Sequence, residues 1–208
     1  MTPENGSVAD VESQLTNLLR FLCTEKSTAV NRMQTSFNWA FAVLTVFIVG
    51  VSSRPGFPGT YMSFFLLNVA FVMLCHFFVR TAKDYVNQIR FAALEKTCLA
   101  CLFSLSIDGK TPQFTDVGKH FELYFVEWKS PKPLANVVRK TLFDHGYFIL
   151  YAVVLTLLTW VGFKINWKDL RPFAILVGTG SVAIIMLRDF GGFYFKCAGE
   201  EESMRGKD

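Results

Sequence analysis

The sequence has few charged residues and few of the motifs that enzymes carry. Asp, Glu, Lys and Arg make up 18% of the 208 residues, and only three residues are His. There is no P-loop, GxSxG or HExxH motif and no pair of carboxylates within an apolar run. The N-terminus is acidic and lacks a basic region followed by an apolar core, so no cleavable signal peptide is expected. These absences argue against an enzyme, and neither a cofactor nor a metal ion is expected.

Hydrophobic residues, in contrast, are abundant. They make up 51% of the chain, and 22 residues are Phe. The mean hydropathy of +0.32 lies above the value expected of an ordinary soluble domain. A soluble fold of this size would expose many of these rings in patches that promote aggregation. Burial in lipid is the simplest explanation for this composition.

Four apolar runs contain no Asp, Glu, Lys or Arg and approach the roughly 20 residues needed to cross a bilayer. They are Thr35–Val51, Tyr61–Val79, Gly146–Phe163 and Pro172–Leu187. The Pro- and Gly-rich segment SSRPGFPGT joins the first pair, and the short polar segment KINWKDLR joins the second. The predicted fold class is all-α: a polytopic membrane protein with two transmembrane hairpins, at residues 35–79 and 146–187.

The distribution of positive charge predicts the orientation of these hairpins. Of the 21 Lys and Arg residues, the two hairpin turns contain only Arg54, Lys164, Lys168 and Arg171. Positive residues near spans are retained in the cytoplasm, so the turns should lie outside and both termini inside. The net charge of +4 is not accompanied by a nucleic-acid reading motif, so direct nucleic-acid binding is not expected.

Three segments remain for the cytoplasmic side: an arm at residues 1–34, an insert at 80–145 and a tail at 188–208. The arm has the apolar spacing of an amphipathic helix, which can pack on the insert, lie on the bilayer or pair with a second copy. No Gly or Pro follows the second run before Gly109, so that helix should project into the cytoplasm beyond about Leu102. The segment after Gly191 is expected to be a mobile tail.

The insert offers aromatic residues for a protein partner and basic residues for lipid. Its aromatic part favours a helix over a strand. The possible partner-binding residues are Phe114, Phe121, Phe125 and Trp128. Further on, Arg139 and Lys140 come just before the third run and can reach lipid phosphates. Membrane lipid and a soluble cytoplasmic protein are therefore the expected partners, together with further copies of the chain.

Two weak motifs suggest chemistry. Cys98 and Cys101 have CxxC spacing, but no second pair completes a zinc site, and a continuous helix is the wrong context for a thioredoxin-like motif. Buried, reduced helical cysteines are the favoured interpretation. Arg139 and His145 match the loose Arg-x(4–6)-His spacing of HEPN ribonucleases, although no helical nuclease domain is evident around them.

Polar and small residues within the apolar runs indicate either helix packing or a pore. Asn68 and His76 on the second run can hydrogen-bond between helices or line an ion path, and packing is favoured. On the fourth run, Ala174 and Gly178 form a small-xxx-small pair that allows close helix approach.

This layout of a short arm, two hairpins and a central insert resembles the small four-span membrane proteins of bacterial antiphage systems. Examples are the membrane subunit of Kiwa and the four-span effectors that accompany nucleotide-signalling synthases. The resemblance is architectural and transfers no functional residue, and it implies that the chain lies in the bacterial inner membrane. Three hypotheses remain: a homo-oligomeric scaffold or sensor that binds a cytoplasmic partner, a triggered homo-oligomeric ion-leak pore, and a membrane-anchored enzyme. They are ranked in that order.

Overall fold

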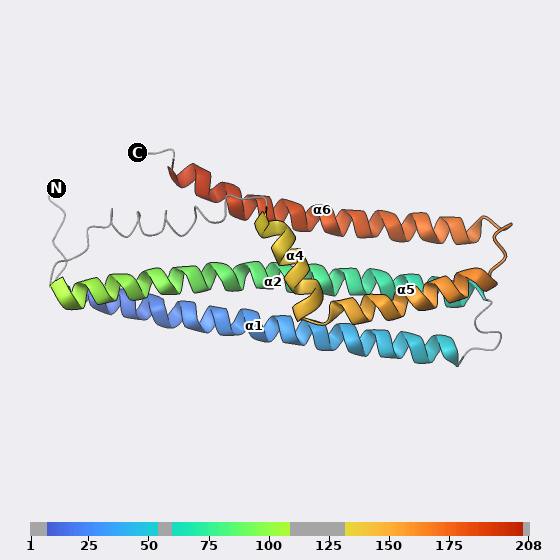
Figure 1. The fold of residues 1–208 in the computed structure, drawn as a ribbon, viewed down its shortest axis with the longest axis horizontal. Coiled ribbons are helices and arrows are strands. Elements are labelled where there is room, and N and C mark those ends of the chain that lie inside the picture. Colours follow the sequence, from blue (N-terminus) through green and yellow to red (C-terminus); the bar gives the residue numbers. More distant parts are fainter. Residues whose placement is uncertain (1–7, 54–59, 109–131, 206–208) are drawn as a thin grey trace.

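The computed structural model describes residues 8–53, 60–108 and 132–205, and these residues form α-helices with no strand. Two long helices, α1 (Val8–Ser52) and α2 (Tyr61–Asp108), lie antiparallel and side by side along their length (Figure 1). At 1.5 Å per residue they span about 68 and 72 Å, more than twice the roughly 30 Å of a hydrocarbon core. The arm and the first apolar run are therefore parts of one helix.

The continuity of α1 and α2 follows from the absence of helix breakers. In α1 the single glycine is Gly50, near its end, and α2 contains neither Gly nor Pro. Nothing in either sequence interrupts the ladder of backbone hydrogen bonds. The prediction that the second helix continues beyond Leu102 is confirmed, because α2 ends at Asp108.

Three further helices complete the described structure. They are α4 (Lys132–Asp144), α5 (Tyr147–Lys164) and α6 (Arg171–Arg205). The tail expected after Gly191 is instead part of α6. Two consecutive glycines there cost roughly 1 kcal/mol each in helix propensity. Phe190 and Tyr194 lie on either side of them and are buried against the core, so tertiary packing offsets that cost.

Four of these helices are long and apolar enough to span a membrane: α1, α2, α5 and α6. The N-terminal end of α1 and the C-terminal ends of α2 and α6 lie at one end of the molecule, opposite the two hairpin turns (Figure 1). The all-helical class and the four candidate spans agree with the sequence prediction. The aromatic residues of the insert, Phe114, Phe121, Phe125 and Trp128, lie outside the described residues.

A buried tyrosine marks the level at which α4 meets α5. Tyr147, the first residue of α5, is fully buried, and its ring makes edge-to-face contacts with Phe37 of α1 and Phe78 of α2. Its hydroxyl lies 2.8 Å from that of Thr81. The preceding Gly146 has a φ of 74°, and a Cβ there would lie 3.2 Å from the Phe37 ring. Only glycine fits this turn without strain.

Candidate functional site

The ends of α1 and α2 beyond their charge-free runs form a two-helix stalk, residues 10–34 of α1 and 80–102 of α2. The stalk is at the same end of the molecule as the C-terminal end of α6 (Figure 1). Its interior contains small and medium apolar side chains at helical spacing. These buried residues are Leu22, Ala29 and Met33 of α1 and Ala82, Val86, Cys98 and Cys101 of α2. The arm thus packs on α2.

One ion pair ties the two helices of the stalk together. The Lys26 ammonium donates to Glu95 Oε2 over 2.7 Å, and Cys23 Sγ lies 3.7 Å from Glu95 Oε1. The hydrogen bond from Lys26 holds the pKa of the Glu95 carboxyl below its usual value. The Lys26 side chain is 37% exposed, so solvent screening keeps the contribution of this pair to stability small.

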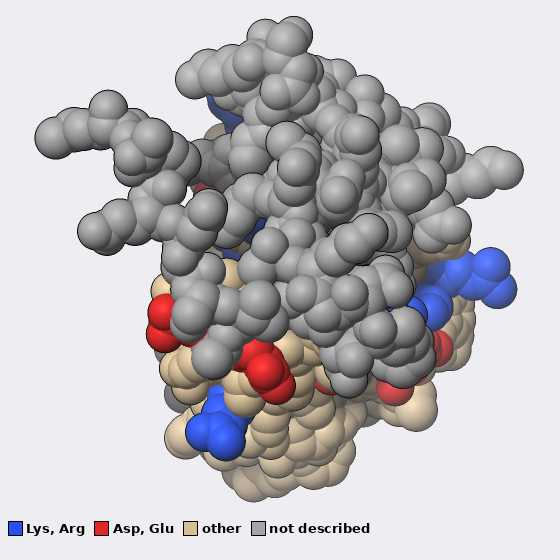
Figure 2. All heavy atoms as spheres, turned by 90° about the vertical axis from the view of Figure 1, so that its left-hand side faces the viewer, with Lys and Arg blue, Asp and Glu red and all other residues tan. Residues whose placement is uncertain are grey.

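The outer surface of the stalk has unexpected apolar side chains. Leu18 and Phe21 of α1 are exposed, one helical turn apart, and Leu99 of α2 is also exposed. Figure 2 views this end of the molecule and shows both acidic and basic side chains on its described part. Leu18 belongs to the apolar stripe of the arm, but Phe21 does not. The position of Phe21 outside the stripe could have predicted from the sequence that its ring is exposed.

The two cysteines of the CxxC motif are buried in the stalk. Cys98 and Cys101 lie one turn apart on α2 and are exposed by only 2% and 4%. Burial raises the pKa of both thiols above the ordinary value, which disfavours the reactive thiolate. Within the described ranges, no three His, Cys, Asp or Glu side chains are grouped so that they could hold a metal ion. The interpretation as buried helical cysteines agrees with this placement.

The two polar residues of the second run have different environments. Asn68 is buried and donates its side-chain amide to the Phe64 carbonyl of its own helix, over 2.8 Å. His76 is exposed, and its ring contacts that of the adjacent Phe77. The structure therefore does not bring Asn68 and His76 together on one surface of the chain.

Helix α6 has a largely open surface. Ala174 and Gly178 are exposed, and a Cβ added at Gly178 would meet no atom within 4 Å. Within the most apolar 18-residue stretch of α6, only 6% of the residues are buried, against 44% in the corresponding stretch of α2. One of its contacts with α2 is the Lys83–Asp189 ion pair, with 2.6 Å between Nζ and Oδ2. The small-residue pair therefore makes no close contact with another of the described helices.

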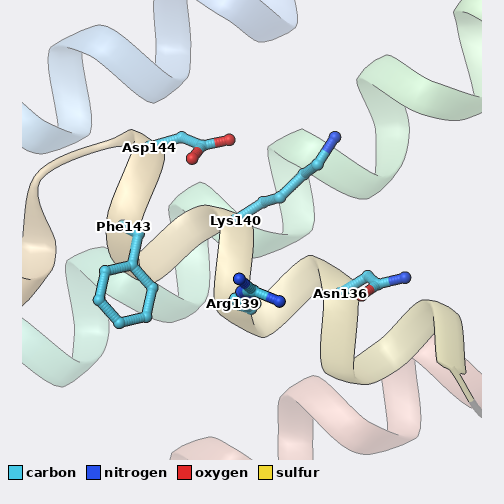
Figure 3. A pocket seen from close by; sticks show the side chains of 5 residues that line it. All are labelled: Asn136, Arg139, Lys140, Phe143 and Asp144. Atoms are coloured by element: carbon cyan, nitrogen blue, oxygen red, sulfur yellow. The ribbon is translucent and has the colours of Figure 1, made fainter.

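Arg139 and Lys140 lie on α4, which crosses α2 from the side of α6 towards that of α1 (Figures 1 and 3). Among the α4 side chains that the structure describes, those of Val137 and Thr141 are buried. A hollow of about 390 Å³, the α4 hollow, is lined by Asn136, Arg139, Lys140, Phe143 and Asp144 (Figure 3). His145 is not among the described residues of its lining, and its ring lies against Tyr85, so the loosely matched pair of Arg139 and His145 does not line one hollow.

Asn136, Phe143 and Asp144 were not singled out from the sequence. The amphipathic pattern of the segment from Leu134 to Phe143 could have indicated them, since it predicts a helix with one buried and one solvent-exposed face. The position of the hollow depends on how α4 crosses α2.

The chain significantly matches no protein-family model, no curated protein and no solved structure. These comparisons therefore assign no function to the chain.

Proposed function

We propose that this protein is a homo-oligomeric inner-membrane scaffold or sensor whose stalk binds a soluble cytoplasmic protein. The observation that carries the proposal is the exposed apolar surface of the stalk. Leu18 and Phe21 are 43% and 56% exposed, on a part of α1 that lies outside the charge-free run. Exposed rings are ordinary on a lipid-facing span, but beside charged residues they favour a protein partner.

The charge distribution supports a cytoplasmic position for this surface. The hairpin turns contain four of the 21 Lys and Arg residues, which leaves 17 for the segments at the stalk's end of the spans. Positive residues near spans favour the cytoplasmic side. The architectural resemblance to four-span antiphage proteins adds a biological setting, in which the stalk would connect the membrane to a soluble defence component.

The open surface of α6 supports assembly with further copies. A second helix can approach closely where Ala174 and Gly178 expose the backbone. Gly178→Leu should therefore reduce oligomer size in mild detergent, measured by mass-resolved light scattering, while leaving the single chain folded. Gly50→Leu is the matched control, because a Cβ there also meets nothing within 4 Å. A wild-type monomer in mild detergent would contradict homo-oligomerisation.

Affinity purification from native membranes tests partner binding. Wild-type protein should co-purify with a stoichiometric soluble protein, and Leu18→Ala with Phe21→Ala should lose it. The matched control replaces Val46 and Val49 by Ala, because these side chains are 70% and 59% exposed but belong to the charge-free run. Loss of the partner in both double variants, or in neither, would contradict the assignment of the stalk as the docking surface.

His76 favours a second candidate function, the ion-leak pore. An exposed histidine within a charge-free run can face a lumen that several copies enclose. His76→Leu should then change the conductance of reconstituted protein at unchanged oligomer size. Asn68→Leu should leave conductance unchanged, because Asn68 is buried within its own chain. Unchanged conductance in His76→Leu would contradict a lumen-lining position for His76.

A further inference from the structure

The α4 hollow combines positive charge with an open position on the molecular surface. Arg139 and Lys140 are exposed neighbours, and neither forms an ion pair within the described parts of the chain. Asn136 contributes an amide one turn before Lys140, and the Asp144 carboxylate lies at the other end of the hollow (Figure 3). Guanidinium and ammonium groups without carboxylate partners are suited to hold a phosphate.

The orientation of α4 is fixed by its buried face. Val137 is 3% exposed and belongs to the main hydrophobic cluster, and Thr141 is fully buried. With these two residues held in the core, Arg139 lies on the opposite side of α4 and Lys140 on its flank, and both side chains are exposed. The helix ends at Asp144, and α5 begins three residues later with the apolar run that can span a membrane. The hollow is therefore at the boundary between polar and apolar parts of the chain.

Apolar surface adjoins the hollow. The rings of Phe143 and Phe148 stack at 5.3 Å, although they are 55% and 51% exposed. A second hollow of about 460 Å³ is lined mainly by apolar groups of α1 and α5: Phe37, Phe41, Ile149 and Leu150, with Asn38 and Gly146. Its lining includes Gly146, which lies two residues, and so no more than about 8 Å, from Asp144 of the α4 hollow.

We propose that the α4 hollow binds one membrane glycerophospholipid. Arg139 and Lys140 contact its phosphate, and the Asn136 amide donates to a phosphate or ester oxygen. Asp144 accepts a hydrogen bond from a headgroup hydroxyl, and an acyl chain lies along Phe143 and the apolar hollow. The adjoining apolar surface distinguishes a lipid from a free phosphate ion. This inference is independent of the proposed cytoplasmic partner.

The binding test uses the full chain in mild detergent, titrated with dioleoyl phosphatidylglycerol and followed by native mass spectrometry. Dioleoylglycerol and inorganic phosphate are the two comparison probes. Phosphatidylglycerol should bind at least ten-fold more tightly than either, because it alone combines the phosphate with acyl chains. Equal binding of inorganic phosphate would reduce the hollow to an anion site and overturn the proposal. Equal binding of dioleoylglycerol would remove the role of the two cations.

Two variants locate the lipid. Arg139→Gln with Lys140→Gln should weaken phosphatidylglycerol binding about ten-fold or more. Lys164→Gln with Arg188→Gln removes the same charge at exposed positions outside the hollow and should have little effect. An equal loss in this control would show general electrostatic attraction and overturn the site. Phe143→Ser, at an exposed position, should also weaken lipid binding, and unchanged binding in this variant would refute the acyl-chain contact.

Discussion

The hydrogen bond between Tyr147 and Thr81 can be tested as a coupling between α5 and α2. Both residues are fully buried, and their hydroxyl oxygens are 2.8 Å apart. Tyr147→Phe keeps the ring contacts with Phe37 and Phe78 and removes only the hydroxyl. A buried hydroxyl left without a partner costs about 1–3 kcal/mol. The remaining Thr81 hydroxyl can rotate towards the backbone carbonyl four residues earlier, so we expect the lower end of that range.

Removing the other hydroxyl of the pair, that of Thr81, should cost more stability. In Thr81→Val the phenol of Tyr147 stays buried, and a tyrosine side chain cannot reach the backbone of its own helix in the way that threonine can. We therefore expect a loss nearer the upper part of the range of about 1–3 kcal/mol. In the double variant both hydroxyls are gone, so the combined loss should be smaller than the sum of the single losses by about 1 kcal/mol.

Equilibrium unfolding in mild detergent, with thermal midpoints as a second measure, checks these values. For a chain of this length, a change of 1 kcal/mol corresponds to a shift of about 2–4 °C. Thr159→Val is the control, since the exposed hydroxyl of Thr159 donates to the Leu155 carbonyl of its own helix; its effect should stay within about 0.5 kcal/mol. Additive single losses would refute the idea that this hydrogen bond couples the two helices.

Three further predictions concern the stalk and the orientation of the chain. In sealed cells, a membrane-impermeant thiol reagent should label Lys168→Cys but not the exposed native Cys23, and labelling of Cys23 would contradict the cytoplasmic position of the stalk. In detergent, Cys23 should react with a maleimide well before Cys98 and Cys101, which are buried; equal reactivity of the three thiols would mean that the stalk opens. Replacing Cys98 and Cys101 by Ser should preserve oligomer size. Because the folded chain lowers the pKa of Glu95, this residue contributes stability above its unfolded pKa of about 4.3 and loses it as the pH falls. Glu95→Gln should therefore remove less than about 1 kcal/mol at pH 7 and flatten the acid side of the melting profile; an unchanged acid profile would contradict this.

The sequence alone predicted the elements whose cause is local. Charge-free runs of 16 to 19 residues identified the four candidate spans. The absence of Gly and Pro after the second run predicted the projection of α2 beyond Leu102. Both signals depend only on composition and helix propensity, which act within a segment. The orientation of the termini and the identity of the partners remain predictions. They too are drawn from local features of the sequence.

Contacts between distant segments decided the rest. Gly191 and Gly192 indicated the end of a helix, yet α6 continues because Phe190 and Tyr194 are buried against residues far away in the sequence. An eight-residue spacing left open whether Asn68 and His76 share a face, and packing buried the first while exposing the second.

The α4 hollow depends most on tertiary structure. The turn at Gly146, against the ring of Phe37, redirects the chain from α4 into α5. Burial of Val137 and Thr141 then leaves Arg139 and Lys140 exposed, on the far side and the flank of α4. The sequence determined which residues are apolar or charged, because that is a property of each side chain. Only the packing of α4 across α2 decided which of them line one surface, because that requires helices from distant parts of the chain to meet.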